Sequence, residues 1–272
     1  MVEKMIFSGH ETFHCKSLWL KKGYDFVKGN GRFTDDACVE LGVGRNMVNS
    51  IRFWLKAFNI IDIQTEKITL IGEFIFDDKT GVDKYLEDET TLWLLHYLLI
   101  INNYSSIYSI IFNDLRKLKP EFDKTNFVYH LNGQGFDLNQ NTLIKDFSVF
   151  YRTYYSKDVQ EIEDSFSGLL SELELIQNIK KENSYKLVIQ NHKQQNLPIE
   201  LILFIILENK DYGKSISFKN LYSDPNSIGN IFAMNRENLE KKLIQLSEKY
   251  SFITYTNDAG IKELQFKKEK PN

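Results

Sequence analysis

The sequence has little cysteine and no long hydrophobic segment. Its two cysteines, Cys15 and Cys38, do not form a Cys-x-x-Cys pair, which excludes a disulfide framework and a cysteine-rich zinc site. The most apolar run, 93–101, contains His96 and is far shorter than the ~20 residues that a membrane-spanning helix needs. Residues 1–10 contain no apolar stretch of the length found in a signal peptide. We therefore expect a cytoplasmic protein with reduced thiols and no membrane partner.

Positive charge is also scarce over the chain as a whole, which has 34 Lys and Arg against 37 Asp and Glu. This net charge of −3 does not by itself indicate a nucleic-acid-binding protein. The charge is distributed unevenly, however. Residues 1–60 hold nine basic and six acidic residues, or +3, and the remainder holds 25 and 31, or −6. Because salt screens surface charges beyond ~10 Å, binding to phosphates depends on such a local excess.

Glycine-rich nucleotide-binding loops are absent too. The sequence has neither a G-x-x-x-x-G-K-[ST] loop nor a G-x-G-x-x-G motif, so we expect no nucleotide hydrolysis and no dinucleotide cofactor in this chain. No cofactor is evident apart from a divalent metal ion, for which the acidic residues 87–89 are one candidate site. We favour the alternative that these acids cap the following helix, because negative charge is stabilising at a helix start.

Only four prolines interrupt the chain, and apolar residues recur at helical spacing, which predicts a mainly helical protein. In the N-terminal region Thr34 is a good N-cap for a short second helix, and a glycine turn separates this helix from a longer third one. Two helices joined by a tight turn and followed by a hairpin are typical of a winged helix-turn-helix. The expected elements are helices over 17–28, 34–41 and 45–58, a turn over 42–44, and a hairpin over 60–70 that turns at 65–67.

The whole pattern predicts a mainly α protein with small β-hairpin wings, an α+β fold. We expect three domains: an N-terminal winged helix-turn-helix over 1–85, a central helical region with a hairpin over 86–195, and a C-terminal winged-helix-like domain over 196–272. The expected central elements are helices over 89–102, 104–119, 143–155 and 158–177, a loop over 132–140, and a hairpin over 179–189. The expected C-terminal elements are helices over 199–208, 217–222 and 235–250 and a hairpin over 252–266.

The third helix of the N-terminal region has one apolar face and one cationic face. Arg45, Asn49, Arg52 and Lys56 share the face opposite the apolar residues, and no acidic residue of the helix interrupts them. Such a face suits a recognition helix in the DNA major groove, where Arg pairs with guanine, Asn with adenine and Lys with phosphate. The predicted DNA-binding residues are Lys16, Lys21, Lys22, Arg45, Asn46, Asn49, Arg52 and Lys56.

Two alternatives remain open for this face. A polar helix face is also what an ordinary solvated helix presents, and winged helices serve as protein-protein modules as well. The third helix of the C-terminal region is a weaker candidate for DNA binding. Its cations are interleaved with acids, as is typical of a solvated or partner-binding face. The residues in question are Arg236, Lys241 and Lys242 with Glu237, Glu240 and Glu248.

Residues 7–14 hold the candidate catalytic groups. His10, Glu11 and His14 match the letters of the H-E-x-x-H zinc motif, but that motif needs a long helix and a third downstream ligand, and neither is apparent. His10 and Glu11 could instead serve phosphodiester hydrolysis, with Lys16 or Lys21 as a cationic stabiliser. The alternative is structural, with both side chains hydrogen-bonded to the fold. His96, in an apolar helix, is expected to be a hydrogen-bonded core residue.

Several segments resemble a bacterial family of unassigned function that is known chiefly from operons for DNA phosphorothioation. The resemblance covers nearly the whole chain, and its N-terminal motifs are specific. Lys16 stands where the family commonly has Arg, Arg45 where it has Lys, and Ser167 where it has Cys. The matching segments are FSGHETF over 7–13, WLKKG over 19–23, LGVGRNMV over 41–48 with 50–52, LED over 86–88 with TLWLLH over 91–96, DFSVF over 146–150, and parts of 163–176.

The resemblance implies a component of a DNA phosphorothioate-modification and antiphage defence system. Its implied partners are double-stranded DNA and the sulfur-transfer proteins of the same system, a cysteine desulfurase and an adenylating sulfurtransferase. In the single-strand type of such a system, the similar member is thought to be a DNA-nicking endonuclease. The alternative is a non-enzymatic winged-helix regulator or scaffold that recruits the sulfur-transfer partners to DNA.

Overall fold

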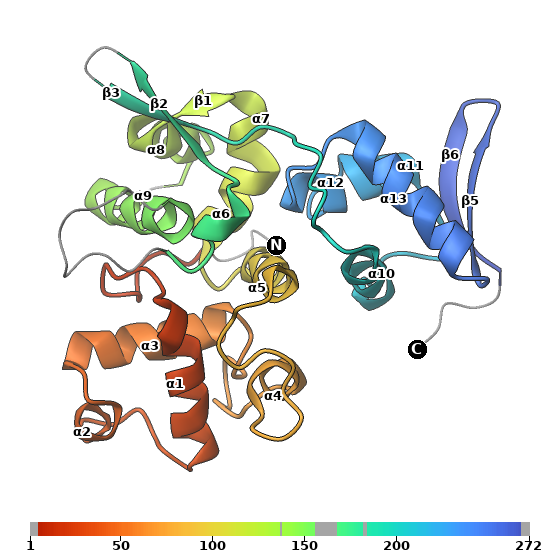
Figure 1. The fold of residues 1–272 in the computed structure, drawn as a ribbon. Coiled ribbons are helices and arrows are strands. Elements are labelled where there is room, and N and C mark those ends of the chain that lie inside the picture. Colours follow the sequence, from red (N-terminus) through yellow and green to blue (C-terminus); the bar gives the residue numbers. More distant parts are fainter. Residues whose placement is uncertain (1–4, 137, 156–167, 182–183, 268–272) are drawn as a thin grey trace. The chain divides into compact units, whose positions relative to one another are not determined.

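A computed structural model describes residues 5–136, 138–155, 168–181 and 184–267 of the chain (Figure 1). The chain divides into two units, Met1–Ile189 and Gln190–Asn272. Both are helix-rich, and each contains a three-stranded antiparallel sheet, so the protein is an α+β mixture. Over the residues that the structure describes, no helix has the length and apolar character needed to cross a membrane.

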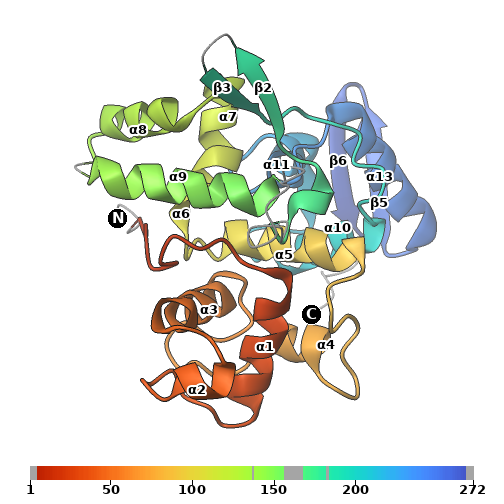
Figure 2. The same ribbon diagram turned by 60° about the vertical axis from the view of Figure 1, so that its left-hand side comes forward.

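The first unit begins with four helices in which α1 contacts α2, α3 and α4, and Figure 2 shows α1, α2 and α3 as one group. The sequence brings α1 close to α3 at Gly23, where a Cβ atom would lie 2.6 Å from Leu55 and 2.8 Å from Ile51. Any larger residue would separate the two helices, since both partners are fully buried. The four helices are α1 (Ser17–Lys28), α2 (Ala37–Leu41), α3 (Arg45–Ala57) and α4 (Leu70–Phe76).

The predicted N-cap at Thr34 is wrong. Helix α2 begins at Ala37, and its N-cap residue Asp36 makes no side-chain cap. The Thr34 carbonyl instead accepts a hydrogen bond from the Ala37 amide at 3.1 Å, so Thr34 belongs to the turn before the helix.

The predicted hairpin over 60–70 is reduced to a single antiparallel bridge between Ile61 and Ile68. The Asp62 carboxylate accepts hydrogen bonds from the amides of Gln64 and Thr65, which closes a local turn where strand residues would have paired. Helix α4, which the sequence pattern did not predict, follows immediately and is capped by the Thr69 hydroxyl. The two strands predicted here are therefore wrong, although the chain reversal is correct.

The rest of the first unit packs two neighbouring helices, α8 and α9, beside a small sheet (Figure 1). The strand order is β1-β3-β2, with Asn178 opposite Leu187 and Lys180 opposite Tyr185 in the hairpin. The elements are α5 (Glu89–Ile101), α6 (Ser106–Ile110), a π-helical turn (Ile111–Leu115), α7 (Arg116–Leu118), β1 (Glu121–Phe122), α8 (Lys124–Gly133), α9 (Gln140–Tyr154), a 3-10 turn (Ser171–Leu173), β2 (Gln177–Lys181) and β3 (Ser184–Val188).

Two central predictions need correction. Residues 156–167, and with them most of the helix predicted over 158–177, lie outside the described residues. The described part of that segment contains a 3-10 turn and the start of β2 rather than an α-helix. Its apolar residues bury against the unit at a spacing that resembles that of a helix. Helix α8 was not predicted, and it extends to Gly133, into the expected loop over 132–140.

The core of the first unit confirms the expected role of His96. Its side chain is fully buried, and Nδ1 lies 2.7 Å from the Tyr154 hydroxyl. Tyr108 pairs in the same core with the Thr153 hydroxyl at 2.9 Å. Burial raises the pKa of Tyr154 well above its usual value. Asp88 likewise caps α5 through the Thr90 amide at 2.7 Å, as the alternative to a metal site predicted.

In the second unit the elements follow in the order helix, strand, three helices, hairpin. Its sheet has the order β4-β6-β5, and Ile216 of β4 pairs with Leu264 of β6. Pro198 is the N-cap residue of α10, and β4 is an additional strand that the sequence did not predict. The elements are α10 (Ile199–Glu208), β4 (Ser215–Ser217), α11 (Phe218–Tyr222), α12 (Ile228–Ile231), α13 (Arg236–Lys249), β5 (Ile253–Asp258) and β6 (Ile261–Phe266).

Candidate nucleic-acid interface

The N-terminal half of α3 exposes polar side chains. Gly42 ends α2 with a φ of 58°, a left-handed conformation that glycine adopts at low cost, and Gly44 then precedes α3. After this turn Arg45, Asn46 and Asn49 are all exposed. A guanidinium and two amides in this position can hydrogen-bond to base edges or to phosphate oxygens.

The C-terminal half of the same face is covered by a carboxylate from outside the helix. Glu66 lies in the segment between α3 and α4, and its Oε1 lies 2.5 Å from Arg52 Nη2 and 2.6 Å from Lys56 Nζ. The Arg52 side chain is 43% exposed, whereas that of Lys56 is only 11% exposed. The prediction that Lys56 lies on the open face is therefore wrong, because the following segment folds back over that end of α3.

The sequence showed no acid within the α3 face, but the fold brings two acids to it. Partial burial raises the pKa of Glu66, yet hydrogen bonds from Lys56 and Arg52 outweigh this effect and lower the pKa below its usual value. Glu66 is therefore a carboxylate at neutral pH. Asp35 lies 3.1 Å from Arg45, but both side chains are more than 70% exposed, so this pair is easily displaced.

A polar hollow of 530 Å³ lies beside Arg52. The Arg52 guanidinium lies 5.9 Å from the centre of the Phe33 ring, which holds it at the edge of the hollow. Arg32, Gln64 and Thr65 also line the hollow, and the sequence pattern did not single them out. Only their position in the turns that flank α1 and α3 could have indicated them. Glu66 lines the same hollow, so these groups form a polar surface in which one carboxylate faces the cations Arg32 and Arg52.

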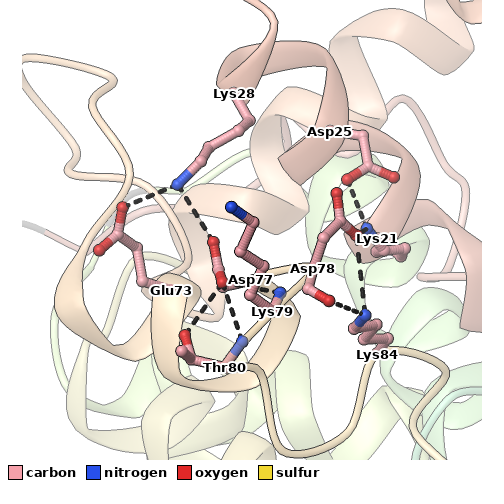
Figure 3. Close-up of polar contacts among 9 residues, drawn as sticks. All are labelled: Lys21, Asp25, Lys28, Glu73, Asp77, Asp78, Lys79, Thr80 and Lys84. Carbon is pink, nitrogen blue, oxygen red and sulfur yellow. Dashed lines mark hydrogen bonds and ion pairs between the residues drawn. The ribbon is translucent and has the colours of Figure 1, made fainter.

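Lys16, Lys21 and Lys22, which were predicted to bind DNA, each contact other groups of the protein instead. Lys16 Nζ lies 5.8 Å from the Trp19 ring centre, and Lys22 Nζ donates a hydrogen bond to the Leu41 carbonyl at 2.8 Å. Lys21 lies 2.5 Å from Asp25 and 3.1 Å from Asp78. Figure 3 shows that Lys21 belongs to a group of ion pairs that joins α1 to α4 and its following loop; the group also contains Lys28, Glu73, Asp77 and Lys84. Lys21 is therefore part of a structural contact between α1 and the loop after α4.

His10 is buried against α3 and α9. Its Nε2 lies 3.1 Å from the Asp146 carboxylate, and its Nδ1 accepts a hydrogen bond from the Thr12 amide at 3.1 Å. The ring lies parallel to that of Trp54 at 6.3 Å and edge-on to that of Phe53 at 5.5 Å. The Nε2 contact is at ion-pair distance without the alignment of a hydrogen bond. With both ring nitrogens facing protein groups, this geometry favours the structural alternative for His10.

Glu11 lies apart from this arrangement. It is exposed, and its φ of 49° shows that residues 10–14 do not form the helix that a zinc protease needs. Among the residues that the structure describes, no group of three or more His, Cys, Asp or Glu gathers as a metal site. The catalytic roles of His10 and Glu11 remain predictions.

The corresponding helix of the second unit, α13, has its cations tied up within the unit. Lys241 pairs with Glu237 at 2.6 Å, and Arg236 lies 5.2 Å from the Phe218 ring centre. Lys242, expected to be exposed, is only 9% exposed and donates to the Leu197 carbonyl at 2.5 Å. Burial lowers the pKa of Lys242. These contacts leave α3, rather than α13, as the better candidate for phosphate contact.

These features define an α+β protein with two helix-rich units, each carrying a three-stranded sheet, and an exposed polar helix near its N-terminus. The chain belongs to the family described as protein of unknown function (DUF4007), whose model matches residues 7–272. Two crystal structures of SspB are similar to it, one of them bound to magnesium ion. Their TM-scores are 0.82 and 0.80 for the magnesium-bound form, each at 25% identity and covering 96% of this chain and 83% of the SspB chain. No curated protein matches the chain.

Proposed function

We propose that this protein is the DNA-binding component of a bacterial DNA phosphorothioate-modification and defence system, and that it contacts double-stranded DNA through α3. The observation that carries the proposal is the exposure of Arg45, Asn46 and Asn49 on a helix that follows a tight glycine turn. In this proposal α1 to α3 form a helix-turn-helix, and the segment after α3 acts as a short wing. The second unit has the element order of a winged helix and is the second such module.

Membership of the phosphorothioation system is supported by two resemblances of this chain, one in sequence and one in fold. The sequence motifs around 7–13 and 41–48 resemble the family found in phosphorothioation operons, and the fold is similar to that of SspB along almost the whole chain. We infer that the partners are a cysteine desulfurase and an adenylating sulfurtransferase of the same system.

In this proposal the two halves of α3 contact different parts of the DNA. Arg45 and Asn49 lie on the exposed half and reach base edges, for which a guanidinium and an amide are specific. Arg52 and Arg32 border the polar hollow and hold a backbone phosphate. Arg52 can take this role only by exchanging the Glu66 carboxylate for a phosphate, so DNA binding and the Glu66 ion pairs compete.

The test is the affinity for a labelled duplex, measured by fluorescence anisotropy. The double variant Arg45→Ala/Arg52→Ala is expected to lose ~1–3 kcal/mol of binding free energy for each residue that reads a base, and less for a phosphate contact. Lys241→Ala is the matched control, because Lys241 is an exposed cation paired with an exposed acid, as Arg45 is. Equal affinity of the double variant and the control would refute the α3 interface.

DNA nicking, with His10 and Glu11 as the catalytic pair predicted from the sequence, is the activity that we propose to test, although the surroundings of His10 favour a structural role for that residue. It is tested by relaxation of supercoiled plasmid with Mg²⁺ or Mn²⁺ and with EDTA, beside His10→Ala and Glu11→Ala. The exposed Glu11 gives the cleaner variant, since its replacement removes no buried contact. Metal-dependent nicking that Glu11→Ala abolishes would support the assignment; salt-sensitive DNA retention without nicking would leave a binding subunit.

The second candidate is a regulator or scaffold that recruits the sulfur-transfer proteins. The observation that favours it is the mixed charge of α13, where acids and bases pair within the unit and leave little net charge. A dimer that protects a palindromic operator would support a regulator. Tight binding to the desulfurase in the absence of DNA would support a scaffold.

A further inference from the structure

A second candidate site lies in the first unit, in the cavity between α8, α9 and the β2–β3 hairpin. The cavity has a volume of 650 Å³, within the ~300–1,000 Å³ that is usual for small-ligand sites. Phe147 and Tyr151 line it from α9, one helical turn apart, and Tyr185 and Leu187 line it from β3. No residue of the α3 interface takes part, so this site does not depend on the function proposed above.

The walls of the cavity are suited to a planar ligand. Tyr151 stacks on Tyr155 with ring centres 4.9 Å apart and an angle of 19° between the planes, which fixes the orientation of the Tyr151 ring. Tyr185 lines the same cavity from β3, and its side chain is 55% exposed. Two aromatic rings that line one opening from a helix and a strand can hold a flat ring by stacking.

A polar group inside the cavity lacks part of its hydrogen bonding. Asn178 Nδ2 donates to the Tyr151 hydroxyl at 2.8 Å, whereas Asn178 Oδ1 is buried and has no hydrogen-bond donor among the residues that the structure describes. The single Tyr151 hydroxyl can satisfy only one of the two amide atoms, so one atom stays unpaired in either orientation of the amide. Because an unpaired buried amide atom is unfavourable, a small rotation of the Asn178 side chain that turns the amide toward a ligand's polar edge would be stabilised by the new hydrogen bond.

Cations stand at the rim of the same cavity. Lys180 pairs with Tyr185 across the hairpin, and Asn178 pairs with Leu187, so Lys180 lies on the cavity-lining face of the two strands. Lys124 lines the cavity from the start of α8, and both lysines are exposed. The acid in the lining, Asp123, is engaged by Lys186 and by the capping of α8, so its charge is compensated.

We propose that this cavity binds one nucleotide unit. The base would lie between Tyr151 and Tyr185, its polar edge would face the Asn178 amide, and its phosphate would lie near Lys180 and Lys124. The nucleotide could come from a free mononucleotide or from an unpaired position in single-stranded DNA, since both present the same base, sugar and phosphate.

The test is isothermal titration calorimetry of the full chain with the four deoxynucleoside 5′-monophosphates and with a short single-stranded oligodeoxynucleotide of mixed sequence. Binding by at least one probe is expected. Tyr185→Ala and Asn178→Ala should each weaken it about ten-fold, in line with the loss of one stacking partner or one base-edge hydrogen bond. Tyr185→Phe should retain it, since the ring supplies the stacking. The matched control is Tyr129→Ala, a tyrosine of α8 that is 79% exposed and outside the cavity lining.

Each outcome is decisive. Binding of the oligodeoxynucleotide alone would assign the site to a DNA strand, and equal binding of a mononucleotide would assign it to a free nucleotide. Failure of every probe to bind would refute the site, as would equal binding by the Tyr185→Ala and Tyr129→Ala variants. Arg45→Ala/Arg52→Ala should leave the titration unchanged, so a failure of the α3 interface can be told apart from a failure of this cavity.

Discussion

Glu66 determines how much of the positive charge of α3 is available to DNA. Its one carboxylate contacts Arg52, which is partly exposed, and Lys56, which is nearly buried. The Lys56 contact is therefore structural, whereas the Arg52 contact can exchange with a phosphate. The acid acts as an internal competitor for the same guanidinium.

Replacing Glu66 with Gln should strengthen duplex binding. The amide keeps a hydrogen-bond acceptor for the two cations but removes the negative charge that competes with phosphate. We expect an affinity gain of about five-fold at low salt, corresponding to the ~1 kcal/mol of a partly exposed ion pair. Fluorescence anisotropy with the same duplex measures it, with Glu237→Gln on α13 as the control. A weaker affinity in Glu66→Gln would contradict the competition.

The same carboxylate should contribute a pH-dependent part of the stability. Because the folded protein lowers the pKa of Glu66, the contribution is present above the usual pKa of 4.5 and is lost as the pH falls through the lower, folded value. Wild type should therefore exceed Glu66→Gln in free energy of unfolding at pH 7, by up to ~1 kcal/mol, and the difference should shrink in acid. Urea denaturation of both proteins at pH 7 and at lower pH measures this; a difference that does not change with pH would refute it.

His10→Ala should destabilise the fold strongly. The substitution removes a ring packed on Phe53 and Trp54, and it leaves the buried Asp146 carboxylate without the facing nitrogen. We expect a loss of ~2–4 kcal/mol in the free energy of unfolding, measured by urea denaturation. Glu11→Ala, at an exposed neighbour, should change it by less than ~0.5 kcal/mol. Equal stability of the two variants would show that His10 has no structural role and would favour the catalytic alternative.

The sequence indicated the exposed residues of the candidate site better than the buried ones. Arg45 and Asn49 were predicted from helical spacing and Asn46 from its place at the start of the helix, and the structure leaves all three exposed. The spacing could not show that Glu66 would reach Arg52 and Lys56, because that contact depends on how the segment after α3 folds back. Helical periodicity describes one element, and the ion pairs arise between elements.

At the scale of the element, α4 is the clearest difference between expectation and structure. The sequence pattern predicted a hairpin over 60–70 and no helix after it. The structure instead caps a helix at Thr69, whose hydroxyl accepts from the Gly72 amide at 3.0 Å and donates to the Asn59 carbonyl at 2.6 Å. One side chain thus ends the chain reversal and begins the helix.

Thr69→Ala should accordingly lower the free energy of unfolding by ~1 kcal/mol, and by up to ~2 kcal/mol because a second hydrogen bond is removed as well. Thr34→Ala is the informative control. Thr34 was the predicted cap of α2, yet its hydroxyl makes only a 3.5 Å contact with the Arg32 carbonyl, so its removal should have little effect. Urea denaturation compares the two, and the reverse order of stability would contradict both assignments.

Elements with strong local signals were predicted with nearly correct bounds, among them α1, α3, α5, α9 and α13. The helix predicted over 104–119 is correct in extent, but it contains a π-helical turn at Ile111–Leu115 that periodicity does not reveal. The predictions were wrong in two kinds of segment. One is a short non-helical segment whose buried apolar residues happen to have helical spacing, as at 169–176; the other is a strand as short as β1 or β4. In these places tertiary packing rather than local preference decides the structure.

At the scale of the whole molecule, the negative net charge and the basic N-terminal region have opposite effects on DNA binding. The net charge of −3 repels a polyanion, so attraction must come from the few cations of one surface. Arg32, Arg45 and Arg52 are the groups of that surface placed to contact phosphates or bases. The DNA affinity of so small a surface should fall clearly as the salt concentration rises, but less than that of a protein with many phosphate contacts.

Two phosphate contacts, from Arg32 and Arg52, would give a slope of about −1.8 in the plot of log affinity against log salt, or a loss of about 12-fold between 50 and 200 mM salt. Anisotropy titrations at four salt concentrations measure the slope. Arg45→Ala/Arg52→Ala should reduce its magnitude by roughly one for each phosphate that the variant no longer neutralises, and Lys241→Ala, on the second unit, should leave it unchanged. If Lys241→Ala reduces the slope and the α3 variant does not, the interface would have to be assigned to the second unit. A slope near zero in wild type would mean that phosphates are not contacted, and the protein would then be the scaffold rather than the DNA-binding component.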